Sequence, residues 1–233
     1  MEEYEKSLKY FFTGFFSFFL VFGLITTKTT LLYSLLYGYV ESRIVEPISS
    51  IGEDVLSLFL YISLNNVFVV FMLIVGSISF LSLEFWLMKF ETFRKYGRGS
   101  LRVREEILLM ARRISPDIKD YKDVILYVTP ATILFLNGGI LGGLFGCVLV
   151  QEGISELIRS FLTLFPHGLI EIPAIIIAGG RGFINAKNFS SYDKPEHFLH
   201  RAKIYYRKSF WKDSFPIVCL ILIGSALEAI KAS

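Results

Sequence analysis

The sequence is poor in charge and in the residues that most often form cross-links or bind metals. Charged residues make up only 19% of the 233 positions, and there are two cysteines and three histidines. Cys147 and Cys219 both fall inside apolar stretches, and the sequence has no CxxC pair and no Cys/His cluster. These absences argue against a disulfide framework, so we expect both thiols to pack as small apolar groups.

Apolar residues are abundant instead, and they gather in long runs. They account for 53% of the chain, with 23 phenylalanines. Several runs reach the roughly 18 to 20 residues that an α-helix needs to cross about 30 Å of hydrocarbon. The expected fold is all-α, one integral membrane domain over residues 1–233 that forms a polytopic transmembrane helix bundle with amphipathic interfacial helices. The runs predict about five spans, at residues 10–26, 65–85, 124–150, 166–184 and 214–230.

The second apolar run is longer than one span requires. It covers residues 55–83 and is interrupted by Asn65 and Asn66. We expect the span to begin near Asn66, because asparagine is a favourable helix N-cap. Residues 55–64 would then form a short surface or re-entrant helix.

The connecting segments differ in character. Residues 26–54 are expected to form a loop whose apolar stretch 31–39 lies at the membrane interface, and residues 151–164 a short linker. After a turn signal at 96–100, apolar residues recur at helical spacing among arginines, which predicts a basic amphipathic helix suited to an anionic membrane face. A further helix is expected to start at Ser115-Pro116-Asp117.

Positive charge is distributed unevenly over these segments. Segment 89–123 holds ten Lys and Arg residues and 181–212 holds eight, whereas the other two connecting segments hold two and one. The positive-inside rule therefore places the basic segments 89–123 and 185–213 in the cytoplasm. The protein is then expected in the cell membrane with its N-terminus inside and its C-terminus outside. The same rule explains the basic charge without a nucleic-acid partner.

Several polar residues are predicted inside the spans. His167 and Glu171 lie four residues apart on one helix face at the start of the fourth span. An ionisable group in the bilayer is unfavourable unless it is paired, so such a residue indicates a site. The predicted topology brings the ends of three spans to the same side of the membrane. The candidate polar cluster comprises Asn65, Asn66, Asn137, His167, Glu171 and Glu228.

Two roles are open for this cluster. Glu171 can accept hydrogen bonds from backbone or asparagine groups and stabilise the bundle, or it can form a proton or cation site with His167. A metal centre is not expected, because the His-x-x-x-Glu spacing is common by chance and a metal needs three or four ligands. No paired carboxylate motif or further nucleophile accompanies these residues, so we expect neither enzyme activity nor a cofactor.

Small residues recur every four positions on two consecutive spans. Such ridges let another helix backbone approach closely. They predict that the third and fourth spans pack together, and they would also support a homodimer. The ridges consist of Gly138, Gly142 and Gly146 on the third span, and Ala174, Ala178 and Gly182 on the fourth.

A family resemblance rests on short motifs that occur in order along the chain. These motifs are Asn65-Asn66, Asn137-Gly138, Pro166-His167-Gly168 with Glu171 and Pro173-Ala174, and Leu227-Glu228-Ala229. In this order they resemble the stage II sporulation protein M family of integral membrane proteins, and the Pro-His-Gly-x-x-Glu-x-Pro run is the most specific part. The resemblance covers residues 1–230, most firmly 65–182. In spore-forming bacteria, this resemblance implies a membrane partner that helps to hold a cell-wall-degrading machinery in place during engulfment.

Two functions from different classes follow from these observations. The first is a non-catalytic membrane scaffold that recruits or stabilises an unidentified membrane protein within the lipid bilayer. The alternative is a small ion- or proton-coupled transporter or channel that uses His167, Glu171 and Glu228. The lack of internal repeats weakens this alternative.

Overall fold

The structure is a computed structural model of the chain. It describes residues 1–26, 34, 38, 55–88, 101–114, 118–192 and 194–232. Every regular element in these residues is a helix, which confirms the all-α fold. The interfacial stretch predicted at 31–39 lies almost wholly outside the described residues, as do the turn predicted at 96–100 and the helix start predicted at Ser115-Pro116-Asp117.

Among the described residues, five helical stretches are long and apolar enough to cross a membrane, as predicted. The second stretch consists of α4, a π-helical turn and α5, which follow one another without a break. Two shorter helices are the basic amphipathic α7 (Leu101–Ile114) and α10 (Pro195–Lys208). The five stretches lie in α1 (Glu2–Thr26), α4 (Val55–Phe71) with η2 (Met72–Gly76) and α5 (Ser77–Leu87), α8 (Tyr121–Gln151), α9 (Ile154–Ser190) and α11 (Phe210–Ala232). Within α9, the candidate span is His167–Ser190.

Two local predictions were wrong. The chain is helical from Val55 onward, so Asn65 and Asn66 lie inside α4 rather than at a helix start. Residues 154–164 belong to α9 and form no loop. The break between α8 and α9 falls at Gly153, whose φ of 89° is a left-handed conformation that glycine adopts without strain.

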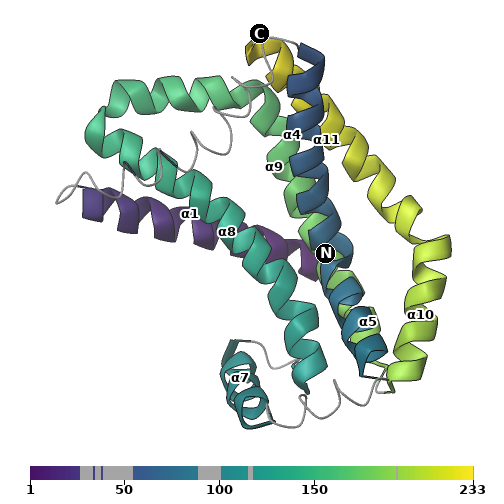
Figure 1. Cartoon of the computed structure of the whole chain (residues 1–233). Coiled ribbons are helices and arrows are strands. Elements are labelled where there is room, and N and C mark those ends of the chain that lie inside the picture. Colours follow the sequence, from purple (N-terminus) through teal and green to yellow (C-terminus); the bar gives the residue numbers. More distant parts are fainter. Residues whose placement is uncertain are drawn as a thin grey trace.

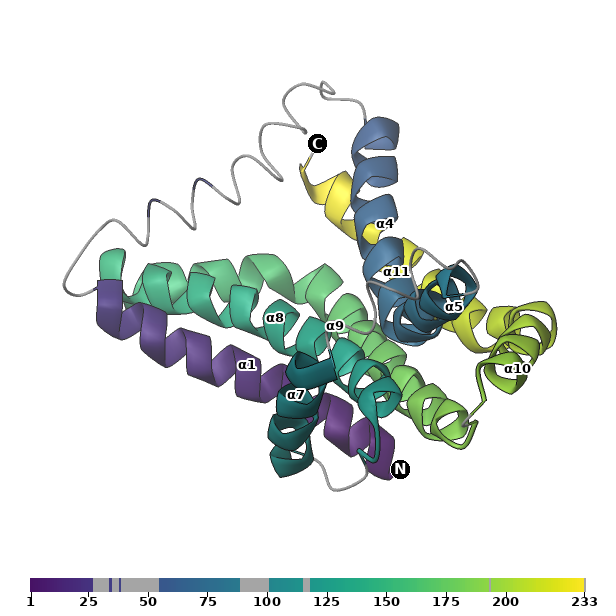
Figure 2. The same cartoon turned by 60° about the horizontal axis from the view of Figure 1, so that its bottom comes forward.

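The helices form two groups that diverge from each other (Figures 1 and 2). Helix α1 lies along α8, and α11 packs on both α9 and α4. Helices α1, α8 and α11 run in one direction, whereas α4–α5 and the later part of α9 run in the other. Early α9 lies across one end of the molecule before the helix turns, and this bend is called the α9 elbow below. Helix α9 contains Pro173, and proline is a common cause of helix kinks.

The glycine ridge of α8 packs against α1, not against α9 as expected. A Cβ atom placed on Gly138, Gly142 or Gly146 would collide with the backbone carbonyl of Phe11, Phe15 or Phe19, respectively. The two helix backbones therefore touch, which only glycine permits. The predicted packing of the third and fourth spans is confirmed, since α8 contacts α9, but this glycine ridge faces α1. Small residues show that a helix is approached closely, not which helix approaches.

The small residues of α9 lie inside the main hydrophobic core. Ala174 and Ala178 are fully buried there. Gly182 faces the carbonyl oxygen of Leu73 in η2 and the ring of Pro130 in α8. Helix α9 is therefore the central helix, with contacts to α1, α4, η2, α8 and α11.

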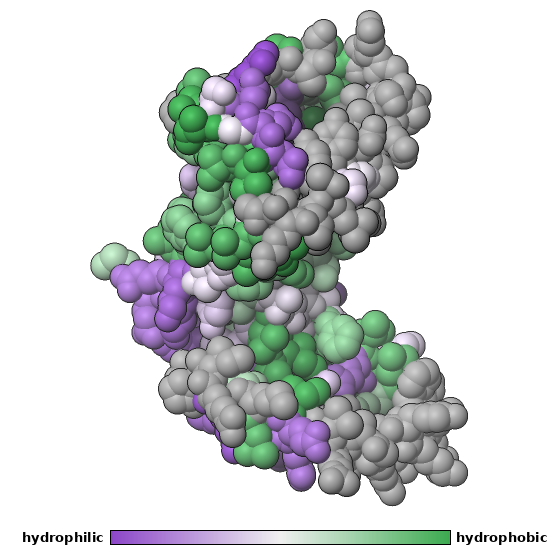
Figure 3. Space-filling model, turned by 90° about the vertical axis from the view of Figure 1, so that its left-hand side faces the viewer, coloured by the Kyte–Doolittle hydropathy of each residue, from purple (hydrophilic) through white to green (hydrophobic). Residues whose placement is uncertain are grey.

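Large apolar side chains also cover much of the surface. Phe12, Phe16, Leu20 and Leu24 are exposed at intervals of four along α1, and Phe16 is 57% exposed. Figure 3 shows apolar residues over much of one face, with hydrophilic residues gathered in separate patches. Lipid tails would cover such a surface without penalty, which fits a multi-pass membrane protein.

The α1–α8 contact generates a paired prediction. Gly142→Ala should lower the free energy of unfolding in detergent by about 1–3 kcal/mol, because the new methyl group meets the Phe15 backbone. Gly23→Ala is the matched control, since the nearest atom to its added Cβ is the Gly146 oxygen at 3.6 Å, an ordinary contact. Equal effects of the two substitutions on thermal or denaturant unfolding would contradict this helix contact.

Candidate functional site

Glu171 lies where α4, α9 and α11 meet. Its Oε1 atom accepts a hydrogen bond of 3.0 Å from Asn66 Nδ2 on α4 and one of 3.3 Å from Ser225 Oγ on α11. Gly224 on α11 makes room for the carboxylate, because a Cβ atom there would lie 2.5 Å from Glu171 Cγ. One side chain of α9 thus connects to two helices that are distant in sequence.

His167 and Glu228 extend this cluster by one helical turn. His167 precedes Glu171 by four residues on α9 and is only 8% exposed. Its Nε2 atom lies 4.0 Å from Glu228 Oε1, too far for a direct hydrogen bond. Its Nδ1 atom is buried and has no hydrogen-bond partner among the described residues. The imidazole therefore faces a carboxylate across a short gap.

The structure brings five of the six predicted cluster residues together. Asn65 is exposed and donates to Asn66 Oδ1 at 3.5 Å, so it lies at the edge of the cluster. Asn137 does not join it, because its Nδ2 atom donates to the Ile133 carbonyl one turn earlier in α8. An asparagine side chain that bonds to the backbone of its own helix in this way needs no partner on another helix.

Two members of the cluster were not predicted from the sequence. Gly224 and Ser225 precede Glu228 by four and three residues, so all three lie on the same face of α11. This spacing is the feature of the sequence that could have indicated that Gly224 and Ser225 belong to the cluster. A serine in an apolar helix is too common to indicate a site until its partner on another helix is known.

The cluster has the chemistry of a hydrogen-bonded junction with two carboxyl groups and one imidazole. Within the described ranges, no group of three or more His, Cys, Asp or Glu residues is placed so that it could hold a metal ion. The residues can accept hydrogen bonds across helices, and His167 and Glu228 can exchange a proton if water bridges them.

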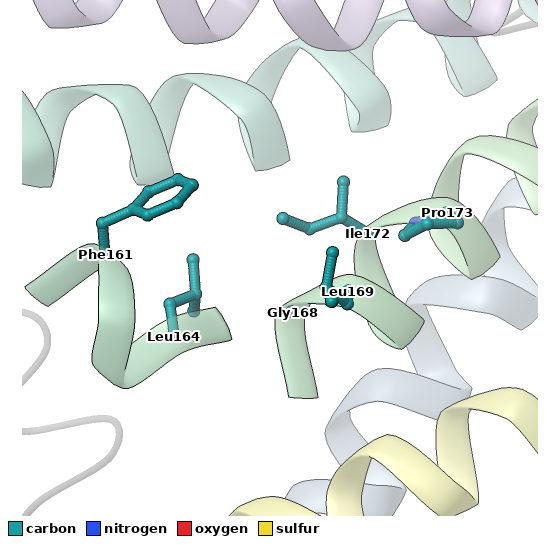
Figure 4. A pocket seen from close by; sticks show the side chains of 6 residues that line it. All are labelled: Phe161, Leu164, Gly168, Leu169, Ile172 and Pro173. Carbon is teal, nitrogen blue, oxygen red and sulfur yellow. The ribbon is translucent and has the colours of Figure 1, made fainter. Parts of the chain in front are cut away.

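An apolar pocket of about 190 Å³ lies in the α9 elbow. Figure 4 shows Phe161 and Leu164 on one arm of the elbow and the other lining residues on the second arm. The lining consists of Phe161, Leu164, Gly168, Leu169, Ile172 and Pro173, none of which belongs to the polar cluster. Glu171 points instead toward α4 and α11, so the pocket and the cluster are separate features of the same helix.

A second buried polar network lies farther along α9, and sequence reasoning missed it. Asn185 Nδ2 donates to the Ile74 carbonyl in η2 at 3.0 Å and to the Tyr205 hydroxyl of α10 at 2.9 Å. The Tyr205 hydroxyl in turn donates to Asp213 Oδ2 at 3.4 Å, and Asp213 pairs with Arg181 at 3.6 Å. Burial raises the pKa of Tyr205 to about 12, so its hydroxyl remains a donor at physiological pH. The network therefore joins α10 to the π-helical turn.

Comparison with known proteins agrees with the motifs. The family model described as Stage II sporulation protein M matches residues 124–232. Neither a curated protein nor a solved structure matches the chain. The matched region includes His167, Glu171, Ser225 and Glu228 but not Asn66, whereas the motifs had suggested a resemblance that begins earlier in the chain. The match supports the resemblance: residues 124–232 of this chain are similar to the stage II sporulation protein M family.

Proposed function

We propose that this chain is a non-catalytic membrane scaffold that recruits or stabilises a partner membrane protein. The observation that supports this most directly is the set of hydrogen bonds that Glu171 accepts from α4 and α11. Both donors are directed at a helix of the same chain, so the carboxylate acts as a structural group at a three-helix junction. The match of residues 124–232 to the family model is consistent with this role.

The junction stabilises the bundle because its polar groups have few other hydrogen-bond partners. Ser225 is fully buried, and Asn66 is half-buried. In hydrocarbon, a donor that loses its protein partner has no water to replace it. Separation of α4 or α11 from α9 would therefore leave unpaired polar groups in the membrane, and a scaffold gains a fixed shape from this constraint.

The orientation follows from charge. Basic residues gather near the ends of the spans where α7 and α10 lie, which we assign to the cytoplasmic side of the cell membrane. The N-terminus is then cytoplasmic and the C-terminus lies outside. The Glu171 junction falls in the outer half of the membrane.

A partner would have to use a surface that the chain leaves open. The Gly138, Gly142 and Gly146 ridge is already covered by α1 of the same chain, so it does not supply a homodimer contact. The exposed ridge of α1, with Phe12 and Phe16 stacked at 6.1 Å, presents rigid aromatic area instead. Aromatic side chains are favourable anchors in interfaces.

One observation favours the second candidate, a proton-coupled transporter. The buried His167 imidazole has an unpaired Nδ1 atom and faces Glu228, whose side chain is 33% exposed. A half-buried carboxylate beside a buried imidazole is an arrangement that can pass protons. This candidate requires that groups among His167, Glu171 and Glu228 change protonation during transport.

The structural role of the junction predicts unequal effects of neighbouring asparagines. Asn66→Ala and Ser225→Ala should each lower the free energy of unfolding by about 1–2 kcal/mol, because Glu171 loses a donor. Asn65→Ala is the control and should change it by less than about 0.5 kcal/mol, since Asn65 is exposed. Unfolding monitored by circular dichroism in detergent measures both. Equal effects at positions 65 and 66 would disagree with the junction.

Photo-crosslinking tests the scaffold directly. A photoreactive amino acid at Phe16, which is exposed, should give a discrete adduct with a second protein in native membranes. The same amino acid at Phe11, which is 3% exposed, should give none. Adducts with lipid alone at Phe16 and at further exposed sites would argue against partner recruitment.

A flux assay separates the two candidates. The purified chain in liposomes should show no proton or cation flux that depends on Glu171, because the carboxylate serves as a hydrogen-bond acceptor. Glu171→Gln keeps the acceptor oxygen and is expected to fold normally. Ion-dependent uptake that this folded variant abolishes would replace the scaffold with the transporter.

A further inference from the structure

Helix α10 has two opposite faces of different chemistry. Phe198, Ala202 and Tyr205 are buried, and the Phe198 ring lies 5.2 Å from that of Phe85 and 5.1 Å from that of Phe189. Residues on the opposite side are exposed at helical spacing, and this basic face includes His200, Lys203 and Arg207. The helix is therefore held by its aromatic side and presents its polar side outward.

The exposed charged residues around α10 are almost all positive. Among the described residues between 194 and 212, Glu196 is the only exposed acidic side chain. Asp213, the next acidic residue, is engaged by Arg181 and Tyr205. The exposed basic residues are Lys194, Arg201, Lys203, Arg207, Lys208 and Lys212.

The basic face leads directly into an apolar, exposed stripe of α11. Trp211 is 68% exposed at the start of α11, and Phe215 is exposed one turn later. Tryptophan is enriched where a span meets the headgroup region. Along the chain the exposed residues are thus cations, then an indole, then apolar side chains, which is the order of layers in a phospholipid leaflet.

The position of this face is fixed by hydrogen bonds to the spans. Asn185 joins Tyr205 to η2, and the hydroxyl groups of Ser79 and Tyr206 lie 2.8 Å apart. Figure 2 shows α10 beside α5 and next to α11. A face held in this way can bind without first being ordered, which favours affinity.

We propose that the basic face of α10 binds the phosphate headgroups of anionic phospholipids in the adjacent leaflet. Lys203 and Arg207 contact the headgroups, and Trp211 lies at the level of the glycerol and upper acyl chains. A lipid fits better than an acidic peptide, because the surface continues into the lipid-facing side of α11. The inference does not depend on the proposed scaffold role.

Trp211 provides the measurement. The chain has two tryptophans, so Trp86→Phe leaves Trp211 as the only indole. The full-length variant is placed in nanodiscs of equal amounts of phosphatidylglycerol and phosphatidylcholine, with bromine, a fluorescence quencher, on the acyl chains of one lipid or of the other. Without a preference the two samples quench Trp211 equally. Next to Trp211 we expect a ratio of phosphatidylglycerol to phosphatidylcholine of about five or more. High salt should lower this ratio toward one.

Charge variants locate the effect. Lys203→Gln with Arg207→Gln should reduce the ratio to near one, whereas Lys9→Gln with Lys119→Gln removes two exposed charges elsewhere and should leave it. Equal quenching by both labels in the parent protein would overturn the proposal. So would an equal loss in both double variants, because net charge and not α10 would then attract the lipid.

Discussion

Glu171 and its two donors are the interaction on which the arrangement of the later spans depends. The carboxylate lies on the central helix, and Asn66 and Ser225 reach it from α4 and α11. In water such hydrogen bonds would exchange freely, but within a bilayer they have no solvent competitor. They therefore select one relative placement of three helices whose apolar surfaces alone would pack in many ways.

The other half of the bundle is held by a different mechanism. Helix α1 contacts α8 through backbone atoms, at glycines that leave no side chain between the helices. Contacts of this kind depend on shape and tolerate no added methyl group. Helix α9 joins the two halves, because it contributes Glu171 to one and packs Gly179 against Leu134 of α8 and Ser7 of α1. The bend of α9 is the geometric link between the two groups of helices.

Much of this organisation could be predicted from the sequence, and the failures have physical reasons. Length and hydropathy located the five spans, and counting residues from the span ends placed Glu171, His167 and Glu228 at one depth. Asn66 was correctly grouped with Glu171, 105 positions away, but the expectation that a helix begins at Asn66 was wrong, because an asparagine inside an apolar run has the same local pattern as an N-cap. The Asn185–Tyr205 network went unnoticed, since an asparagine near a span end has no distinguishing pattern. The spacing of residues along the sequence indicates their depth in the membrane and the helix face on which they lie. Their hydrogen-bond partners depend on how the helices pack.

The three-helix junction requires that Asn66 stabilise the protein by donating to Glu171, and a double-mutant cycle tests this most directly. The free energy of unfolding is measured for Asn66→Ala, Glu171→Leu and the double variant. The structure predicts a coupling energy of about 0.5–2 kcal/mol, so that Asn66→Ala destabilises the parent chain but has little effect once Glu171 is replaced. Additive effects, with no coupling, would contradict the proposed three-helix junction.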